Sequence, residues 1–287
     1  MNERLGNRTS LFRDFTRRLV KSWSAKLGLY LFLAIVLICF IGPFFCRYGK
    51  NDIDITAINA APSREHLLGC DTLGRDMLVR LLYGGQYSIV LGLVAALFGN
   101  FVGLAIGLVA GYFGGRTESV IMRVMDVWSA LPGMMLCILV SAVLGSNFFS
   151  TVVALTVGGV PGGTRMERGQ VLAERSKEYI EAAERINCSK LSIMFRHLLP
   201  NTIQPTIVMT TMSIGGTIGM AASLSYIGLG IQPPTPEWGA MLAEGKNYIR
   251  NFPHLITVPG VAIALTVLAL NLLGDGLRDA LDPKLRD

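Results

Sequence analysis

Charged side chains and histidine are scarce in this sequence of 287 residues. Lys, Arg, Asp and Glu together make up 16% of it and hydrophobic residues 51%, and the mean hydropathy is +0.48. The three histidines are far apart, and the five cysteines show none of the spacings typical of a metal site. We therefore expect neither a metal centre nor acid–base catalysis from these residues. The histidines are His66, His197 and His254.

The sequence also lacks a phosphate-binding loop of the G-x-x-x-x-G-K-[ST] type. The nearest fragment, Gly245-Lys246-Asn247, has neither the loop nor the hydroxyl residue, so we do not expect this chain to bind ATP. There is no H-E-x-x-H helix and no pairing of a nucleophile with a base, which argues against an enzyme. The apolar segments contain almost no ionisable groups, which disfavours a carrier driven by an ion gradient.

Long apolar segments are abundant. They predict an all-α membrane protein with six transmembrane helices, and five of the six are long enough to cross a hydrocarbon core of about 30 Å. The fourth is short and rich in glycine. The expected spans are Leu27–Phe45, Ser88–Tyr112, Val124–Leu144, Phe148–Val160, Thr206–Leu229 and Leu255–Leu273.

Charge asymmetry supports the fourth span and sets the orientation. With six spans and an internal N-terminus, 19 of the 26 Lys and Arg residues fall in inner segments and seven in outer loops. Without the fourth span, the split becomes 11 inside and 15 outside. The positive-inside rule prefers the first arrangement, with both termini in the cytoplasm. The net charge of +6 then reflects topology and some attraction to anionic lipid, and it requires no nucleic acid.

This topology divides the chain into five parts. Cys46 and Cys70 both fall on the outer side, so a disulfide between them remains open. The parts are a basic cytoplasmic segment (1–26), a first anchor helix (27–45), an extracytoplasmic loop with an interfacial helix at 77–83 (46–87), a core of five spans (88–274) and a cytoplasmic tail (275–287).

The charged segment Ser176–Asn201 predicts two short amphipathic helices that form a docking surface for a soluble partner. In the first helix one face carries apolar residues and the other carries charge, and Glu181 and Arg185 have the i,i+4 spacing of a surface ion pair. Asn187 can end the first helix in the left-handed conformation, and Ser189 can cap the second. The expected apolar face consists of Tyr179, Ala182, Ala183 and Ile186.

The second helix of this segment is expected to end at Pro200, because proline breaks helices. Its expected buried stripe consists of Leu191, Met194, Phe195 and Leu198.

Glycine recurs at every fourth position of the second span, which allows another helix backbone to approach closely. Packing within one subunit is the favoured interpretation, and contact with a partner subunit is the alternative. The glycines are Gly99, Gly103, Gly107 and Gly111.

Two outer segments are candidates for contact with an extracytoplasmic partner. Arg75 and Asp76 lie in the first, where a solvated structural role is the favoured interpretation and contact with loop groups or with a partner is the alternative. Glu237 and Trp238 follow three prolines in the second. Proline stiffens the chain, so the second segment is either a rigid docking surface or a simple connector.

Several motifs resemble those of binding-protein-dependent ABC importer permeases. Glu181-Ala182-Ala183 with Leu198-Leu199-Pro200-Asn201 resembles the EAA loop, although Asn187 stands where the family usually has Gly. Leu68–Asp76 is similar to the family's L-G-T-D-x-L-G-R-D, with Cys70 in place of Thr. Further similarities, at Gly228–Gly239 and Asn271–Pro283, point to the C-type subunit of the dipeptide/oligopeptide/nickel group.

The resemblance implies a type I ABC importer-like fold in the bacterial inner membrane. It implies a homologous second permease, two ATPase subunits that bind ATP and Mg²⁺, and an extracytoplasmic binding protein. The cargo would be a dipeptide or oligopeptide, with nickel, a metal chelate or glutathione as alternatives. No cofactor is expected in this chain. The residues implied in ATPase coupling are Tyr179, Glu181, Ala182, Ala183, Asn187, Leu199 and Pro200.

Overall fold

The computed structural model describes residues 22–281, so residues 1–21 of the predicted basic segment and 282–287 of the predicted tail lie outside the described residues. The described chain is helical apart from turns, loops and an isolated bridge between Cys70 and Asp76. Its α-helices are α2 (Trp23–Ile41), α3 (Met77–Phe113), α4 (Gly115–Ser129), α5 (Gly133–Leu144), α6 (Phe148–Arg175), α7 (Glu178–Arg185), α8 (Lys190–Ser192), α9 (Leu199–Tyr226), α10 (Trp238–Gly245) and α11 (His254–Leu281). Short helices are η1 (Gly42–Phe45), η2 (Ile55–Ala57), η3 (Ile193–Leu198) and η4 (Lys246–Tyr248).

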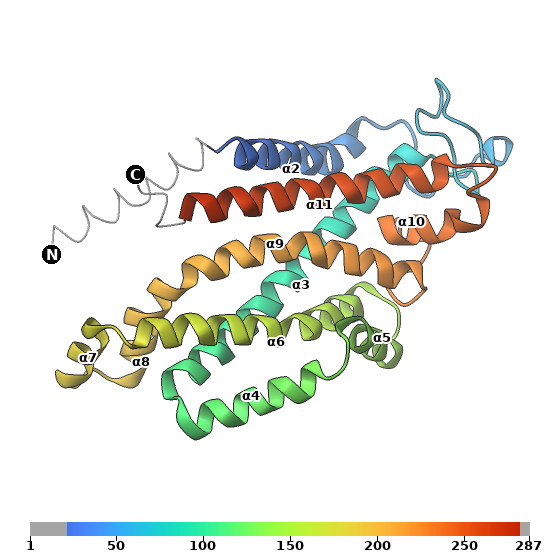
Figure 1. Ribbon diagram of the computed structural model, residues 1–287. Coiled ribbons are helices and arrows are strands. Elements are labelled where there is room, and N and C mark those ends of the chain that lie inside the picture. The colour runs from blue at the N-terminus through green and yellow to red at the C-terminus, as the bar shows by residue number, and fades with distance from the viewer. Residues whose placement is uncertain (1–21, 282–287) are drawn as a thin grey trace.

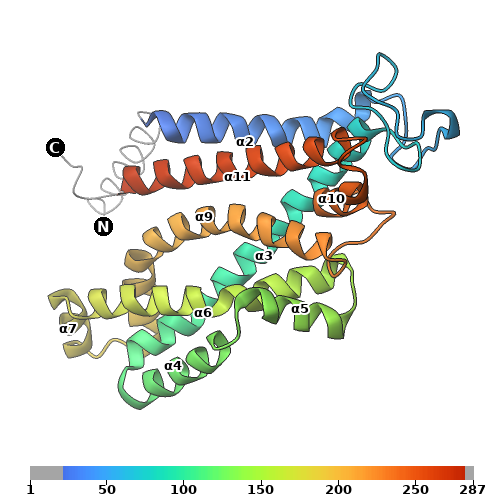
Figure 2. The same cartoon turned by 45° about the vertical axis from the view of Figure 1, so that its right-hand side comes forward.

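The long helices form an elongated bundle. Figures 1 and 2 show α2, α11, α9 and α6 running lengthwise, with α3 crossing them obliquely. The helix α7 lies at the same end of the bundle as the first turn of α2, whereas α10 and the loop between α2 and α3 lie at the opposite end (Figure 1). The predicted docking segment and the predicted outer loops are therefore at opposite ends.

The helix α3 is longer than the sequence predicted. Its 37 residues correspond to about 55 Å. Asp76 caps it by accepting a hydrogen bond from the backbone N–H of Val79 at 2.9 Å. The interfacial helix expected at 77–83 is thus the first part of one continuous helix with the second span.

The third span, predicted as one helix over Val124–Leu144, is broken. Its two halves belong to α4 and α5, which meet at an angle of 80°. Pro132 directly precedes α5. Proline has no backbone N–H and keeps the residue before it, here Leu131, out of the helical region. The mean hydropathy of the segment does not reveal this bend.

The predicted fourth span is the first half of α6, which continues to Arg175 as a helix of 28 residues. The glycine seam of α3 packs against it. A Cβ atom on Gly103 would lie 2.9 Å from the backbone of Gly163, and one on Gly111 would lie 2.7 Å from the Cβ of Val171. The favoured interpretation, close packing within one subunit, is confirmed.

Four helical stretches of the described chain are long and apolar enough to cross a membrane, or five if the bent pair of α4 and α5 counts as one span. The expected number of six is therefore not confirmed by length and composition, because α6 is not among them. The cysteines Cys46 and Cys70 are free thiols. The four stretches are Trp23–Phe45, Met77–Phe113, Lys190–Tyr226 and His254–Ala280.

Candidate coupling surface and outer-loop core

The predicted turn of the docking segment is present. Asn187 has a φ of 59°, in the left-handed region, and ends α7 two residues after Arg185. Ser189 caps α8 by accepting a hydrogen bond from the backbone N–H of Ser192 at 3.3 Å. Asparagine adopts this conformation more readily than most residues other than glycine. The two predicted helices therefore meet where the sequence indicated. We call Glu178–Leu198 the coupling segment.

The second helix does not end at Pro200. The helix η3 is a π-helix that continues directly into α9, and Pro200 is the second residue of α9. Proline is tolerated in the first turn of a helix, and a π-helical turn accommodates a break in regular hydrogen bonding. A continuous helical path therefore runs from Lys190 to Tyr226. The coupling segment is directly continuous with a membrane span.

The buried face of the coupling segment packs on α3 and α6. It differs from the predicted stripe, since Leu191 and Phe195 are 67% and 58% exposed and Ile186 is 76% exposed. Ala182 and Tyr179 are also exposed, whereas Ala183 is buried. The cluster consists of Leu108, Tyr112, Val171, Ile180, Ala183, Ile193, Met194 and Leu198.

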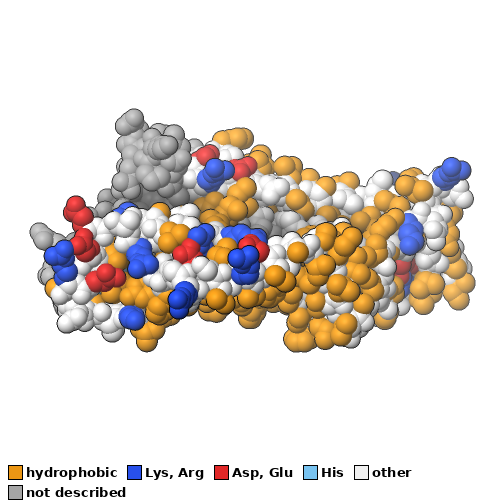
Figure 3. Space-filling model, turned by 60° about the horizontal axis from the view of Figure 1, so that its bottom comes forward, with side chains coloured by type: hydrophobic (Ala, Val, Ile, Leu, Met, Phe, Trp, Pro, Cys, Tyr) orange, Lys and Arg blue, Asp and Glu red, His pale blue; other side chains and the backbone are white. Residues whose placement is uncertain are grey.

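The exposed side of the coupling segment thus combines apolar and charged groups. The predicted pair of Glu181 and Arg185 is present, with the Oε1 and Nη2 atoms 2.5 Å apart. Figure 3 shows charged side chains gathered toward the end of the molecule that carries α7, and hydrophobic side chains dominating the other half of that face. Three large apolar side chains left in solvent beside such charges are typical of a surface that docks a soluble protein.

Tyr179 joins α7 to its neighbours. Its hydroxyl donates to Glu174 Oε1 at 2.5 Å, and Asn201 Nδ2 donates to the same hydroxyl at 3.2 Å. Partial desolvation of the hydroxyl and its hydrogen bond to the Glu174 carboxylate raise the pKa of Tyr179. The phenol therefore stays neutral and fixes α7 against the ends of α6 and α9.

Sequence reasoning missed a buried carboxyl group near this surface. Glu167, on α6, has 0% exposure and accepts hydrogen bonds from the hydroxyls of Thr202 and Thr206 on α9, at 2.6 and 2.7 Å. A signal was available, because Glu167 continues the helical spacing of the buried residues Val160 and Thr164. Because this stretch was expected to be an inner loop, the buried position of Glu167 was not predicted.

The four residues expected to contact an outer partner are almost inaccessible. Arg75 and Asp76 are 3% and 5% exposed, and Glu237 and Trp238 are each 1% exposed. This burial does not fit a direct contact. The physical reason is that their polar groups form hydrogen bonds and ion pairs within the loop and at the helix ends. These partners could not be identified from the sequence.

Arg75 belongs to a network of buried charges. Its Nε atom lies 2.6 Å from Asp71 Oδ2, and its Nη2 atom lies 3.0 Å from Glu244 Oε1 on α10. Arg80 of α3 reaches the same two carboxylates at 3.1 Å each. Asp76 pairs with His66 at 2.8 Å. These pairs tie the outer loop to α3 and α10.

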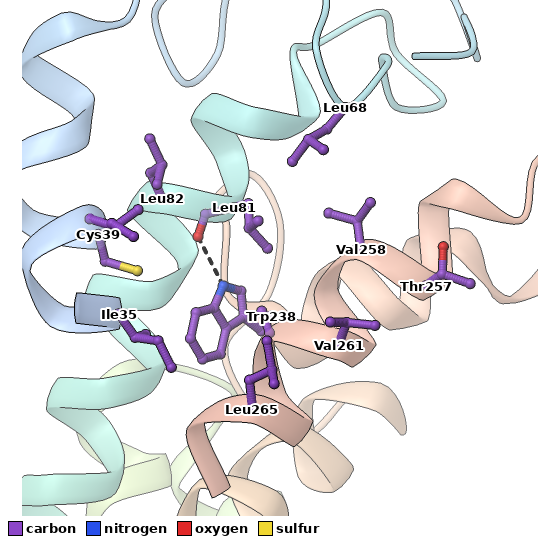
Figure 4. Close-up of a pocket in the computed structure, with 12 residues that line it drawn as sticks. Ile35, Cys39, Leu68, Leu81, Leu82, Trp238, Thr257, Val258, Val261 and Leu265 are labelled. Carbon is purple, nitrogen blue, oxygen red and sulfur yellow. Dashed lines mark hydrogen bonds between the residues drawn. The ribbon is translucent and has the colours of Figure 1, made fainter. Parts of the chain in front are cut away.

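Glu237 and Trp238 fasten α10 to α3. Glu237 accepts hydrogen bonds from the Ser88 hydroxyl at 2.8 Å and from the backbone N–H of Ala240 at 2.9 Å. Desolvation raises the pKa of Glu237, and these hydrogen bonds oppose the rise. The Trp238 indole N–H donates to the Leu81 carbonyl at 2.9 Å. Figure 4 shows this bond beside an apolar pocket of about 400 Å³.

No charged residue of the described chain lines that apolar pocket. A second cavity, of about 240 Å³, lies between α3, α6 and α9 and has polar groups in its wall. There, the Asn100 amide donates to the Ser213 hydroxyl at 2.9 Å, and Thr217 lies one turn further along α9. A third cavity, of about 370 Å³, follows α9 outward past Ser223 and Tyr226.

Fold and site together define an all-helical membrane subunit with an exposed docking segment continuous with a span. Comparison with known protein families then specifies the class. The profile of the binding-protein-dependent transport system inner membrane component matches residues 103–287, and that of the N-terminal TM domain of oligopeptide transport permease C matches residues 10–62. The chain belongs to the family of binding-protein-dependent transport system inner membrane components.

Individual relatives agree. The glutathione transport system permease protein GsiD of Salmonella paratyphi A is 46% identical over 276 residues, which covers 96% of this chain and 91% of that protein. The protein of the same name from Escherichia coli O6:K15:H31 is 42% identical over the same length and shares. An inward-facing structure of the MetNI methionine ABC transporter has a similar fold, with a TM-score of 0.60 and 19% identity, over 72% of this chain and 98% of that one.

These findings confirm the resemblance that the motifs indicated. The chain is a permease subunit of an ABC importer of the peptide-type group and a multi-pass protein of the inner membrane.

Proposed function

We propose that this permease forms one half of a cargo pathway for short peptides and is driven by ATPases that dock on the coupling segment. The observation that carries the proposal is the exposed face of that segment. Ile186, Leu191 and Phe195 are all more than half exposed although they are large and apolar. The same segment continues without interruption into α9. Force applied there therefore has a direct helical route to the spans.

In this proposal the chain crosses the membrane six times. The bent pair of α4 and α5 makes one crossing and α6 makes another, with both termini and the coupling segment in the cytoplasm. The support is the excess of Lys and Arg in the inner segments together with the position of α7 at the same end as the first turn of α2 (Figure 1).

The free face of α9 is the proposed wall of the pathway. Two cavities follow it, and between Ser213 and Ser223 it carries small and hydroxylated residues together with Met220. Gly216 and Gly219 have no atom within 4 Å of where a Cβ would lie. Open glycines within a helix reduce its stability, so their presence favours an interior surface over a lipid-facing one. The polar members of this face are Ser213, Thr217 and Ser223.

The proposed cargo is a short peptide, with glutathione as the first compound to test. The GsiD relatives carry glutathione transport in their name, and glutathione is itself a tripeptide. The groups of the inner cavity wall, such as Asn100 and Ser213, are uncharged hydrogen-bonding groups that suit amides. A second, homologous permease would supply the opposite wall, and an extracytoplasmic binding protein would deliver the cargo.

ATP and Mg²⁺ would bind to two separate ATPase subunits and not to this chain. Their closure would push the coupling segments of the two permeases together and switch the pathway from inward-open to outward-open. A few kcal/mol of differential binding suffice to shift such an equilibrium.

The test is co-purification of ATPase subunits with the tagged permease from membranes of its own host, in mild detergent. Ile186→Asp should abolish ATPase recovery because it places a charge in the centre of the docking face. Ile55→Asp is a matched control, since Ile55 is 77% exposed and Ile186 76% exposed, at opposite ends of the molecule. Equal ATPase recovery with both variants would refute the docking assignment. Uptake of labelled glutathione and of a labelled dipeptide then identifies the cargo.

A further inference from the structure

Glu167 has no role in docking or in the cavity walls, yet it is one of the most enclosed charged residues of the described chain. Its exposure is 0%. Thr202 donates to its Oε1 atom at 2.6 Å and Thr206 to its Oε2 atom at 2.7 Å. Both carboxyl oxygens are therefore occupied by hydroxyls from a single neighbouring helix.

No ion pair to Glu167 is present among the described residues. The nearest arginines in sequence are directed elsewhere, because Arg165 pairs with Asp126 and Arg168 pairs with Glu118. Burying a carboxyl group is unfavourable unless its hydrogen bonds are satisfied, and one placed within a membrane protein usually serves function. The two threonine hydroxyls satisfy the hydrogen-bonding capacity of this group at both of its oxygens.

The helix α3 closes the remaining side. A Cβ atom on Gly107 would lie 2.7 Å from the Cβ of Glu167 and 2.6 Å from the carbonyl oxygen of Thr164. Only glycine allows the two backbones to approach this closely. Glu167 is therefore held against α9 and has no free space on the α3 side.

The position of this contact matters for coupling. Glu167 lies about two turns before the end of α6, which leads into α7. Thr202 and Thr206 lie in the first two turns of α9, directly after η3. The contact therefore joins the helix that enters the coupling segment to the helix that leaves it.

We propose that Glu167 is a positioning residue for energy coupling, which ties the inner ends of α6 and α9 so that they move as one body when ATPases displace the coupling segment. This inference rests on the proposed function. Two short hydrogen bonds to adjacent turns of one helix resist both sliding and rotation, since either motion breaks at least one of them. Without the tie, displacement of the coupling segment would separate α6 from α9 and would not move the two helices together.

The first experiment compares variants of the assembled transporter in proteoliposomes, with its binding protein and cargo. The measurement is cargo moved per ATP hydrolysed. Glu167→Leu should lower this ratio at least about fivefold, within the usual range of coupling energies, while the ATPases still co-purify. Glu167→Gln should lower it less, because a carboxamide keeps one acceptor oxygen. Thr211→Val is the control, since that hydroxyl donates only to the Ile207 carbonyl.

A double-mutant cycle tests whether the threonines act through Glu167. Adding Thr202→Val to Glu167→Leu should cause little further loss if the two side chains form one unit. If the contact only supports folding, Glu167→Leu would reduce the amount of inserted protein, or would reduce transport and ATP hydrolysis by the same factor. An unchanged ratio of cargo to ATP in Glu167→Leu therefore overturns the proposal. If that variant fails to insert, the same criterion applies to Glu167→Gln and to Thr202→Val alone.

A second readout needs no cargo. Spin labels attached at Gly169→Cys on α6 and Gln204→Cys on α9, both exposed positions, report the separation of the two helices near the tie. The five native cysteines are first replaced. The distance should stay constant between nucleotide-free and ATP-bound states in the parent and should change in Glu167→Leu. A change of this distance with nucleotide in the parent refutes the tie, whereas a parent that shows no ATP-dependent transport in the first experiment refutes the proposed function instead.

Discussion

Replacing Arg75 with alanine tests whether the buried charge network holds the outer loop in place. The side chains of Arg75 and Asp71 are each 4% exposed, and that of Glu244 is 20% exposed. The substitution leaves two carboxylates without the guanidinium that lies between them. Removing one partner of a buried ion pair typically costs about 3–5 kcal/mol, because the remaining charge is uncompensated.

The expected cost here is smaller for two reasons. Arg80 still lies 3.1 Å from both Asp71 and Glu244, and Glu244 has partial access to water. We therefore expect a loss of about 2–3 kcal/mol. For a chain of this size that corresponds to a fall of roughly 5–10 °C in apparent melting temperature. Arg75→Lys should be intermediate, because an ammonium group cannot reproduce the fork that contacts two carboxylates.

The assay is thermal unfolding of the purified protein in detergent, followed by size-exclusion chromatography of the soluble fraction. Arg64→Ala is the matched control, since Arg64 belongs to the same loop but is exposed. Added salt should change the difference between the two variants very little, because buried pairs are weakly screened. Equal melting temperatures for Arg75→Ala and Arg64→Ala would refute this account of the outer loop.

Two further predictions concern single residues. Asn187→Gly should leave the coupling segment as resistant to limited proteolysis as the parent. Asn187→Val should expose it, because the left-handed conformation costs most side chains about 1–2 kcal/mol whereas glycine and asparagine adopt it more readily. Since the pKa of Glu237 is raised, its contribution to stability is present below the ordinary carboxyl range and is lost as pH rises through the raised pKa. The melting temperature should therefore fall with rising pH in that window, and Glu237→Gln should remove this part of the dependence.

Local signals in the sequence predicted a good deal of this molecule. The turn at Asn187, the cap at Ser189 and the ion pair between Glu181 and Arg185 each depend on residues within four positions of one another, and all three are present. The glycine spacing correctly indicated that another helix of the same subunit approaches α3 closely, and the structure identifies that helix as α6. Each of these features is determined by the spacing of residues along a helix or by the backbone preference of one residue, and both can be read from the sequence.

Features that depend on distant partners could not be predicted in the same way. Arg75 was expected either to have a solvated structural role or to contact loop groups or a partner protein, but it is buried against Glu244, which is 169 positions away. The bend at Pro132 is not visible in the mean hydropathy, and Pro200 lies in the first turn of α9, directly after a π-helical turn. Burial of Glu167 follows from two hydroxyls on another helix.

Charged and uncharged polar groups occupy different parts of the bundle, and the proposed function gives a reason for this distribution. Buried charges concentrate toward its two ends, with Arg75 and Arg80 at the end that carries α10 and Glu167 near the coupling segment. Between them, the groups lining the α3–α6–α9 cavity are uncharged, as Asn100 and Ser213 illustrate. A fixed charge there would hold an oppositely charged cargo and slow its release, whereas conduction requires binding that is weak enough to reverse. In the proposed function, firmly tied ends would let the helices transmit force, and a neutral wall would leave the cargo free to dissociate.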